Sequence, residues 1–288
     1  MKRFIPLLIL LFGCQKSKTQ VEPSVATFEK LPQTFSITGA SIKEASGIAD
    51  SKSFPGHLWV EQDSGNPPVI YLLKYDGSVT DSVLLEGAIN RDWEDIALGS
   101  GPDDGTNYLY VGDIGDNEAK YPDYTIYRFA EPVAGVEKVS IFDRIDFTYP
   151  DGGHDAEAFV VDDVSKDIYI ITKREVKSKI YKLPYPQSAG SMNQAVFVAD
   201  LNYSGVVSAA LSANGNEMMI KTYTQLFYYA RSQGEEISET LKKTPKTLDY
   251  QIEAQGESVS FAIDQSGFFT LSEEAMGIVP KLNFYKRK

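Results

Sequence analysis

The sequence predicts an all-β fold, a five-bladed β-propeller built from four-stranded antiparallel blades. The first observation is a five-fold repeat in which Ser or Glu is followed two residues later by an apolar residue, at Ser46, Glu94, Glu157, Ser208 and Glu257. These positions lie 48, 63, 51 and 49 residues apart. The second observation is that two further apolar runs follow each position, broken by Gly, Pro, Asp and Asn, as short strands and turns require.

The repeats assign each blade in turn. Blade one is expected from residue 44 to about 86, blade two from 92 to about 149, blade three from 155 to about 203 and blade four from 205 to about 253. Blade five begins at residue 256 and contains only three strand-like segments before the chain ends at 288. Tyr and Phe, with 17 and 15 copies, suit the half-buried surfaces of such strands.

The missing strand of blade five is expected upstream of the repeat. Residues 33–40 alternate Phe35 and Ile37 with polar neighbours, as a half-buried strand does. Pairing of this segment with blade five would close the ring and leave no free sheet edge. The only helical pattern is a turn within 234–243, so residues 33–288 are expected to form one domain.

The N-terminus has the pattern of an export signal. Basic residues precede an apolar stretch at 4–12 that is too short to span a bilayer as a mature helix. The ending Leu-Phe-Gly-Cys at 11–14 resembles the lipobox of bacterial lipoproteins. That resemblance implies a signal peptide at 1–13, a lipid on Cys14, a flexible tether over 14–32 and attachment to a membrane of the cell envelope, with the side unspecified. The alternative is an ordinary secretory signal with an incidental cysteine.

The net charge restricts the partners. The chain has a net charge of −12. Loss of the signal would reduce the number of basic residues from 28 to 26 against 40 acidic residues, so the net charge would become −14. Nucleic acid requires a basic surface, so it is excluded as a partner. Attraction to an anionic membrane surface is also absent, so a membrane anchor would have to be the lipid. Cys14 is the single cysteine, and no intramolecular disulfide is possible.

The repeated Ser/Glu positions are expected to ring the axial channel, because the first strand of a propeller blade is innermost. Three carboxylates in one narrow ring raise one another's pKa or require a cation. Together with two serines they form an all-oxygen shell, which suits calcium before magnesium. The predicted ligands are Ser46, Glu94, Glu157, Ser208 and Glu257. The alternative is a water-filled channel without metal.

The ends of the second strands should return to the same mouth. Asp63 and Asp113 are the candidate proton acceptors there. Lys173, Arg174 and Lys221 are the candidate groups for binding a small anionic substrate, since the rest of the protein is so acidic. The alternative for these basic residues is pairing with nearby glutamates.

The order Ser, Glu, Glu, Ser, Glu resembles the calcium-activated nucleotidases, or apyrases, which are five-bladed propellers with an axial calcium. The resemblance covers the blade starts and second strands over about 44–262, including the segment LYVGDIGD at 108–115. It implies that the five ring residues hold the ion. The chain lacks that family's basic residue at 62–65, its Lys-Glu-Trp at 116–118 and its Ser-Glu-Glu after Lys221. The resemblance therefore favours the fold and the metal over a nucleotide substrate.

Two functions are consistent with this sequence. The first is a calcium-dependent hydrolase of phosphate esters or anhydrides. The second is a non-catalytic propeller that binds a ligand or a protein partner and has either a structural metal or a water-filled channel.

Overall fold

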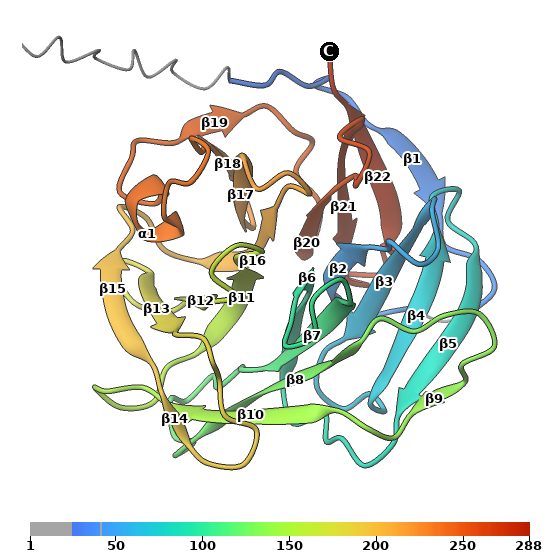
Figure 1. The fold of residues 1–288 in the computed structure, drawn as a ribbon. Helices are drawn as coiled ribbons and strands as arrows, with labels where there is room; N and C mark the ends of the chain where they lie inside the picture. The colour runs from blue at the N-terminus through green and yellow to red at the C-terminus, as the bar shows by residue number, and fades with distance from the viewer. Residues whose placement is uncertain (1–24, 41) are drawn as a thin grey trace, which may run out of the picture.

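The computed structural model describes residues 25–40 and 42–288 and confirms a five-bladed β-propeller (Figure 1). From the axis outwards, blade one contains β2 (Ala45–Asp50), β3 (His57–Gln62), β4 (Val69–Lys74) and β5 (Val79–Leu85), and blade two contains β6 (Trp93–Ser100), β7 (Asn107–Asp113), β8 (Tyr124–Ala130) and β10 (Asp143–Thr148). Blade three contains β11 (Ala156–Val161), β12 (Ile168–Thr172), β13 (Lys179–Leu183) and β15 (Val196–Asp200), and blade four contains β16 (Val206–Leu211), β17 (Glu217–Thr222), β18 (Leu226–Ala230) and β19 (Lys246–Leu248). Blade five contains β20 (Gly256–Phe261), β21 (Gly267–Ser272), β22 (Lys281–Lys286) and β1 (Gln33–Ser36). The predicted helical turn is α1 (Ile237–Thr240).

Two blades receive a short fifth strand from the next blade along the chain. The strand β9 (Lys138–Val139) lies in the connection before β10 and pairs in parallel with β5 of blade one. The strand β14 (Asn193–Gln194) precedes β15 and pairs in parallel with β10 of blade two. These additions cover the outer edges of blades one and two and tie neighbouring blades together at the rim.

The N-terminal strand closes the ring as predicted. In the antiparallel pair of β1 and β22, Gln33 lies opposite Phe284 and Ser36 opposite Lys281. The second half of the predicted 33–40 strand leaves blade five, because Thr38 bridges to Ser78 of blade one. One segment thus pairs with the last blade and then contacts the first.

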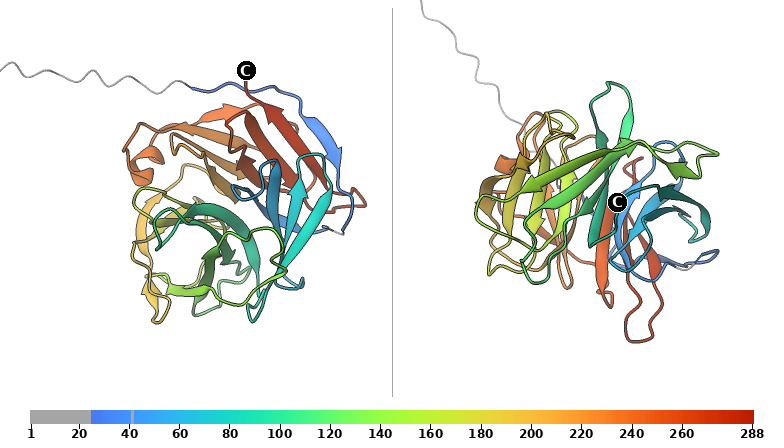
Figure 2. Two further views of the ribbon diagram at one scale, coloured as in Figure 1. Left: turned by 45° about the vertical axis from the view of Figure 1, so that its right-hand side comes forward. Right: turned by 90° about the horizontal axis from the view of Figure 1, so that it is seen from below.

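Residues just before this strand also pack against the propeller, although the sequence assigns them to the tether. Phe28 bridges to Arg287, and its ring packs edge-on against Phe268 with 5.0 Å between centroids. The side chain of Phe28 is buried in the core between blades four and five. The N-terminal segment and the C-terminus therefore lie side by side at the rim (Figure 2), and the predicted boundary at residue 33 is too late.

The apolar core is divided into five clusters, one between each pair of neighbouring blades. Between blades one and two, for example, Trp59 packs in the same cluster as Trp93 and Tyr127. Apolar residues therefore cover both faces of the sheets, as the near-continuous apolar runs of the inner strands require. This packing fixes the five inner strands around the axis and so positions whatever they carry at its ends.

Candidate metal centre at the axial mouth

Each inner strand begins with a β-bulge, and this irregularity forms the polar ring. The register against the second strand shifts by one residue at the start of β2, β6, β11, β16 and β20. Bulges of this kind insert one extra residue and redirect its side chain. The extra residues are Ser46, Glu94, Glu157, Val207 and Glu257.

The predicted register is therefore off by one in blade four. Val207, an apolar residue, takes the ring position, and Ser208 pairs with Lys221 one residue deeper. The Ser208 hydroxyl accepts a hydrogen bond from the N–H of Val259 at 3.2 Å, so it links blades four and five. Among the predicted ligands, the structure places Ser46 beside Glu94, with 3.4 Å between Oγ and Oε2.

Two carboxylate triads meet at the mouth. Asp63, Asp92 and Glu94 form one, and Glu94, Asp155 and Glu157 form the other. Within each triad the carboxylate oxygens lie within 4.8 Å of one another. Glu94 belongs to both, so the triads make one continuous acidic surface.

Asp92 and Asp155 were missed by the sequence analysis. Each stands two residues before a ring glutamate, so the motif Asp-x-Glu opens both blade two and blade three. This repeated motif is the signal that would have identified them.

The basic side chains at the mouth do not balance the negative charge of these carboxylates. Burial, together with the charges of Glu157 and Asp63, raises the pKa of Glu94 well above its usual range. Burial raises the pKa of Asp63 to about 6 and that of Glu157 to about 8, the latter in spite of a lysine partner. A site that favours protonated carboxyls in this way also favours a cation.

The basic residues predicted to bind substrate are engaged by acidic or carbonyl groups. Lys173 forms an ion pair with Glu157, and Arg174 pairs with Asp155. The side chain of Lys221 has no exposed surface, and its Nζ lies 3.9 Å from Glu253. Arg174, about half exposed, is the one of the three that extends into solvent. The position of Lys221 does not fit the predicted contact with a ligand.

The two candidate proton acceptors occupy different positions. Asp63 is part of a triad. Asp113 is nearly fully buried, and its carboxylate accepts the backbone N–H of Asp92 at 2.7 Å. Asp113 therefore fixes the backbone that presents Asp92, rather than facing the mouth itself.

His154 supports the third blade from behind the mouth. Its Nδ1 lies 2.6 Å from Glu175, and its Nε2 lies 3.0 Å from Asp151. Burial acts to lower the pKa of His154, but the hydrogen bonds and charges of Glu175 and Asp151 outweigh burial and raise the pKa. His154 thus links the turn that leads into Asp155 to Glu175 and Asp151.

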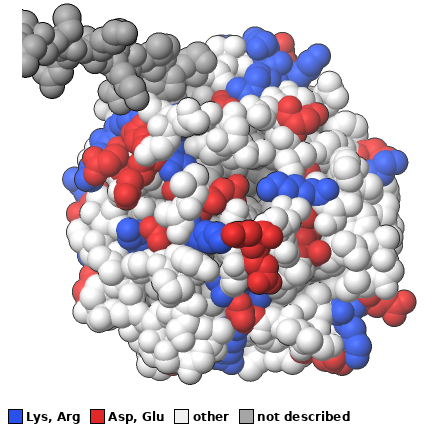
Figure 3. All heavy atoms as spheres, in the orientation of Figure 1, with Lys and Arg blue, Asp and Glu red and all other residues white. Residues whose placement is uncertain are grey.

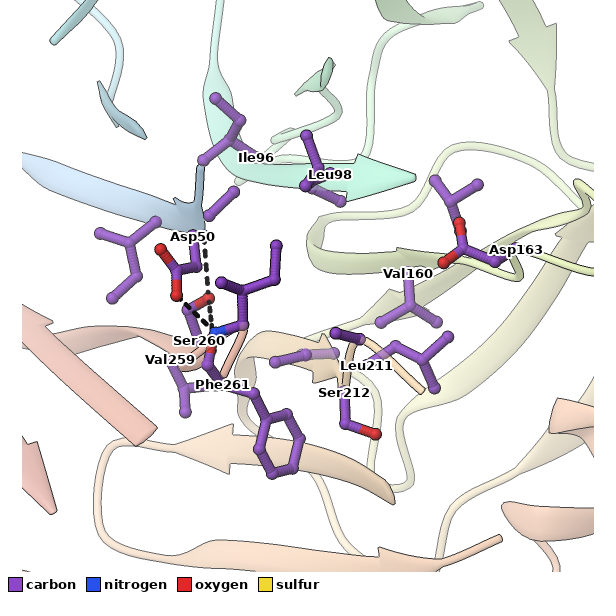
Figure 4. Close-up of a pocket in the computed structure, with 18 of the residues that line it drawn as sticks. Asp50, Ile96, Leu98, Val160, Asp163, Leu211, Ser212, Val259, Ser260 and Phe261 are labelled. Carbon is purple, nitrogen blue, oxygen red and sulfur yellow. Dashed lines mark hydrogen bonds between the residues drawn. The ribbon is translucent and has the colours of Figure 1, made fainter. Parts of the chain in front are cut away.

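The opposite end of the channel is lined mainly by aliphatic side chains, with Asp50, Lys52 and Asp163 among them (Figure 4). Its lining contains one aliphatic residue from each blade, namely Ile48, Ile96, Val160, Leu211 and Val259. The N–H of Asp50 donates to the Ser260 hydroxyl at 3.2 Å and joins blades one and five at this end. Charged side chains of both signs surround the hollow in the middle of the face shown in Figure 3. The two carboxylate triads are at the other end of the axis, the carboxylate mouth.

No protein-family model matches the sequence, and no curated protein matches it. Among solved structures, the chain is similar to the hydrazine synthase of Kuenenia stuttgartiensis, with 9% identity, a TM-score of 0.43 and coverage of 78% of this chain and 80% of that chain. The chain is also similar to the Dos1 propeller, with 10% identity, a TM-score of 0.39 and coverage of 84% of this chain and 68% of that chain. For a chain of a nidogen–laminin complex the identity is 11%, the TM-score 0.43, and the coverage 80% of this chain and 72% of that chain. Likenesses this distant say nothing about the activity of this chain.

The described part of the chain contains no helix long and apolar enough to span a membrane. Cys14 and the predicted signal lie outside the described residues.

Proposed function

We propose that this protein is an envelope-anchored lipoprotein whose propeller mouth binds calcium and, with the ion bound, hydrolyses a phosphate ester or anhydride. The observation that carries the proposal is Glu94, which is shared by two carboxylate triads and whose pKa is raised by burial and then by its acidic neighbours. Five acidic side chains converge there, whereas the cations paired with them reach only Glu157 and Asp155.

The donor atoms suit a hard cation. All of them are carboxylate or hydroxyl oxygens, which calcium prefers. Gly115 leaves the space that the carboxylates occupy, because a Cβ at this position would collide with Glu94 and lie 2.6 Å from Oδ2 of Asp92. We therefore expect Asp63, Asp92, Glu94 and Asp155 to provide ligands, with Ser46 beside them.

Side chains of the protein would accept the proton, bind the substrate and position the ligands. The chemistry that a calcium ion supplies when bound is polarisation of phosphoryl oxygens. Asp63, whose pKa burial raises to about 6 in the metal-free chain, can accept a proton from an attacking water through the carboxylate oxygen that does not bind the ion. Arg174 reaches solvent beside the triad and can hold an anionic group of the substrate. Asp113 keeps Asp92 in place.

A binding module is the second candidate, and one specific observation favours it. Lys173 is paired with Glu157 and Lys221 is fully buried, so two of the three basic groups expected to hold an anion are already engaged. In this case the mouth would bind calcium and capture a ligand or protein partner without turnover.

A phosphate-release screen tests the hydrolase. Nucleotides, sugar phosphates and inositol phosphates are offered to the purified protein with calcium and with a chelator. We expect release that requires calcium and falls by about 10²-fold or more in Asp63→Asn, which removes the proton acceptor but keeps an oxygen ligand. Asp76→Asn, at an exposed turn of blade one, is the matched control.

Calcium binding and phosphate release, measured on the same purified protein, distinguish the hydrolase from the binding module. A calcium-dependent rise in the thermal midpoint, lost in Glu94→Gln, is expected for either candidate because an ion that binds only the folded chain stabilises it. Calcium binding without phosphate release across the panel would leave the binding module. Absence of any calcium response would exclude both as stated.

The lipid anchor has its own test. Cells expressing the chain are labelled with a radioactive fatty acid, and wild type is compared with Cys14→Ala. We expect label and membrane association in wild type and neither in the variant. Equal labelling of the two chains would contradict the anchor and leave the ordinary secretory signal.

A further inference from the structure

The hollow at the aliphatic end of the channel is closed at its inner end. Asp95 of blade two is fully buried, and its carboxylate accepts the backbone N–H groups of Phe159 in blade three at 3.4 Å and of Ala209 in blade four at 3.5 Å. Blades two and four are not neighbours in the ring, so this side chain crosses the axis. Asp95 also stands one residue nearer the mouth than Ile96 of the wall. The hollow is therefore a blind pocket, separate from the carboxylate mouth.

The size and the wall of the hollow suit a branched alkyl group. Its volume is about 60 Å³. One water needs roughly 10–15 Å³ of such space, and an apolar cavity of about 150 Å³ holds benzene. The five aliphatic side chains of the wall, one from each blade, offer no hydrogen bond to water in the hollow (Figure 4). An alkyl group that displaces such poorly held water gains affinity.

Lys52 and Asp163 bring opposite charges to the lining of the hollow. Lys52 is exposed on the turn after β2, and its ammonium has no hydrogen-bond or ion-pair partner among the described residues. Asp163 lies on the turn between β11 and β12, where its Oδ1 accepts the N–H of Ser100 at 2.7 Å and leaves Oδ2 available. The two groups thus reach the opening from blades one and three.

Asp50, the third charged residue of the lining, is already engaged by the protein. Its Oδ2 accepts the hydroxyl of Tyr75 and the N–H of Ile263, both at 2.5 Å, and its side chain is buried. Asp50 therefore holds the wall together, and Lys52 and Asp163 are the charged groups left to meet a ligand.

We propose that this hollow binds a free aliphatic α-amino acid of the leucine, isoleucine and valine class. The alkyl side chain fills the aliphatic ring, the carboxylate pairs with the ammonium of Lys52, and the amino group pairs with Asp163. A zwitterion complements both charges, whereas a fatty acid or an alkylamine places a like charge against one of them. Mostly apolar walls with a few convergent polar groups are typical of small-molecule sites. The inference does not rest on the function of the mouth.

Equilibrium dialysis with radiolabelled leucine tests the site. The purified full-length chain is dialysed in chelator, because the hollow requires no ion. We expect one leucine per chain and a loss of affinity of about 10-fold or more in Lys52→Met and in Asp163→Asn, each of which removes one charged partner. Asn keeps the acceptor for the N–H of Ser100. Lys74→Met, which removes a half-exposed lysine of blade one outside the lining, should bind leucine as wild type does.

Three analogues and a blocking variant define the ligand and its place. Isocaproate lacks the amino group of leucine, isoamylamine lacks its carboxylate, and N-acetylleucinamide presents the side chain as a peptide does. Each is expected to compete with leucine about 10-fold less well or worse. Leu211 is partly exposed in the wall, so Leu211→Phe should fold, fill the hollow and abolish leucine binding, with the thermal midpoint as the check on folding.

The outcomes that would overturn the proposal are distinct. A folded wild-type chain that binds no leucine contradicts the site. An analogue that binds as tightly as leucine contradicts the amino-acid class, and N-acetylleucinamide in that role would indicate a side chain of a partner protein instead. Unchanged binding in Leu211→Phe would place leucine elsewhere. If Asp163→Asn does not fold, Lys52→Met and Leu211→Phe still decide, because both positions reach solvent. Loss of calcium binding or of phosphate release at the mouth leaves this inference standing.

Discussion

At the scale of single residues, Lys173 competes with any ion at the mouth. Its ammonium pairs with Glu157, which belongs to one of the two triads. Both side chains are largely buried, so removal of the lysine alone leaves an uncompensated carboxylate. We expect Lys173→Met to lower the stability of the metal-free chain by about 3 kcal/mol and to increase the stabilisation by calcium, measured as thermal midpoints with and without the ion.

The matched control is Lys179→Met, which removes a partly exposed lysine paired with Asp151 away from the triads. It should reduce stability by less than about 1 kcal/mol and leave the calcium increment unchanged. An equal calcium increment in Lys173→Met and wild type would show that Lys173 and the ion do not share Glu157.

Individual residues also show which parts of the site could be predicted from the sequence. The ring glutamates were predictable because the five-fold repeat assigns them one position. The ring position of blade four was assigned to Ser208 instead of Val207, since a bulge adds one residue without changing the apolar pattern and a serine resembled the residue expected there. The buried state of Lys221 was not predictable, because it depends on Glu253 and Gly256, which lie more than thirty positions away in the sequence.

At the scale of strands, the closing segment was predictable and its preceding residues were not. The count of three strands in blade five required a fourth, and the alternation at 33–40 supplied it. Residues 25–32 lack periodicity, so nothing in the pattern indicates that Phe28 packs against Phe268. A single aromatic anchor in a polar segment produces no periodic signal.

Phe28 should therefore contribute to stability. Its ring lies in the core cluster between blades four and five. We expect Phe28→Ala to lower the free energy of unfolding by about 3 kcal/mol, measured by denaturant titration. Leu31→Ala, which truncates a side chain that is 76% exposed, should have an effect below about 0.5 kcal/mol. Similar values for the two variants would mean that the segment does not anchor the chain.

At the scale of the whole molecule, the acidic axis should make stability depend on pH. Burial raises the pKa of Asp63 and of Asp113 to about 6, and burial with Glu257 raises that of Glu273 to about 9. A raised carboxyl pKa means that the folded chain binds more protons than the unfolded chain between the two pKa values. Its stabilising contribution is complete below the unfolded pKa of about 4 and is lost as pH rises through the folded value.

The metal-free protein is therefore expected to be most stable at mildly acidic pH and to lose about 3 kcal/mol or more between pH 5 and pH 8. Calcium should oppose this loss, because an ion replaces protons on the same carboxylates and binds better when they are ionised. Thermal midpoints measured from pH 5 to pH 8 should fall steeply in chelator and remain nearly level in calcium. Parallel slopes in the two conditions would contradict a cation at the axis, since the carboxylates would then titrate without regard to the ion.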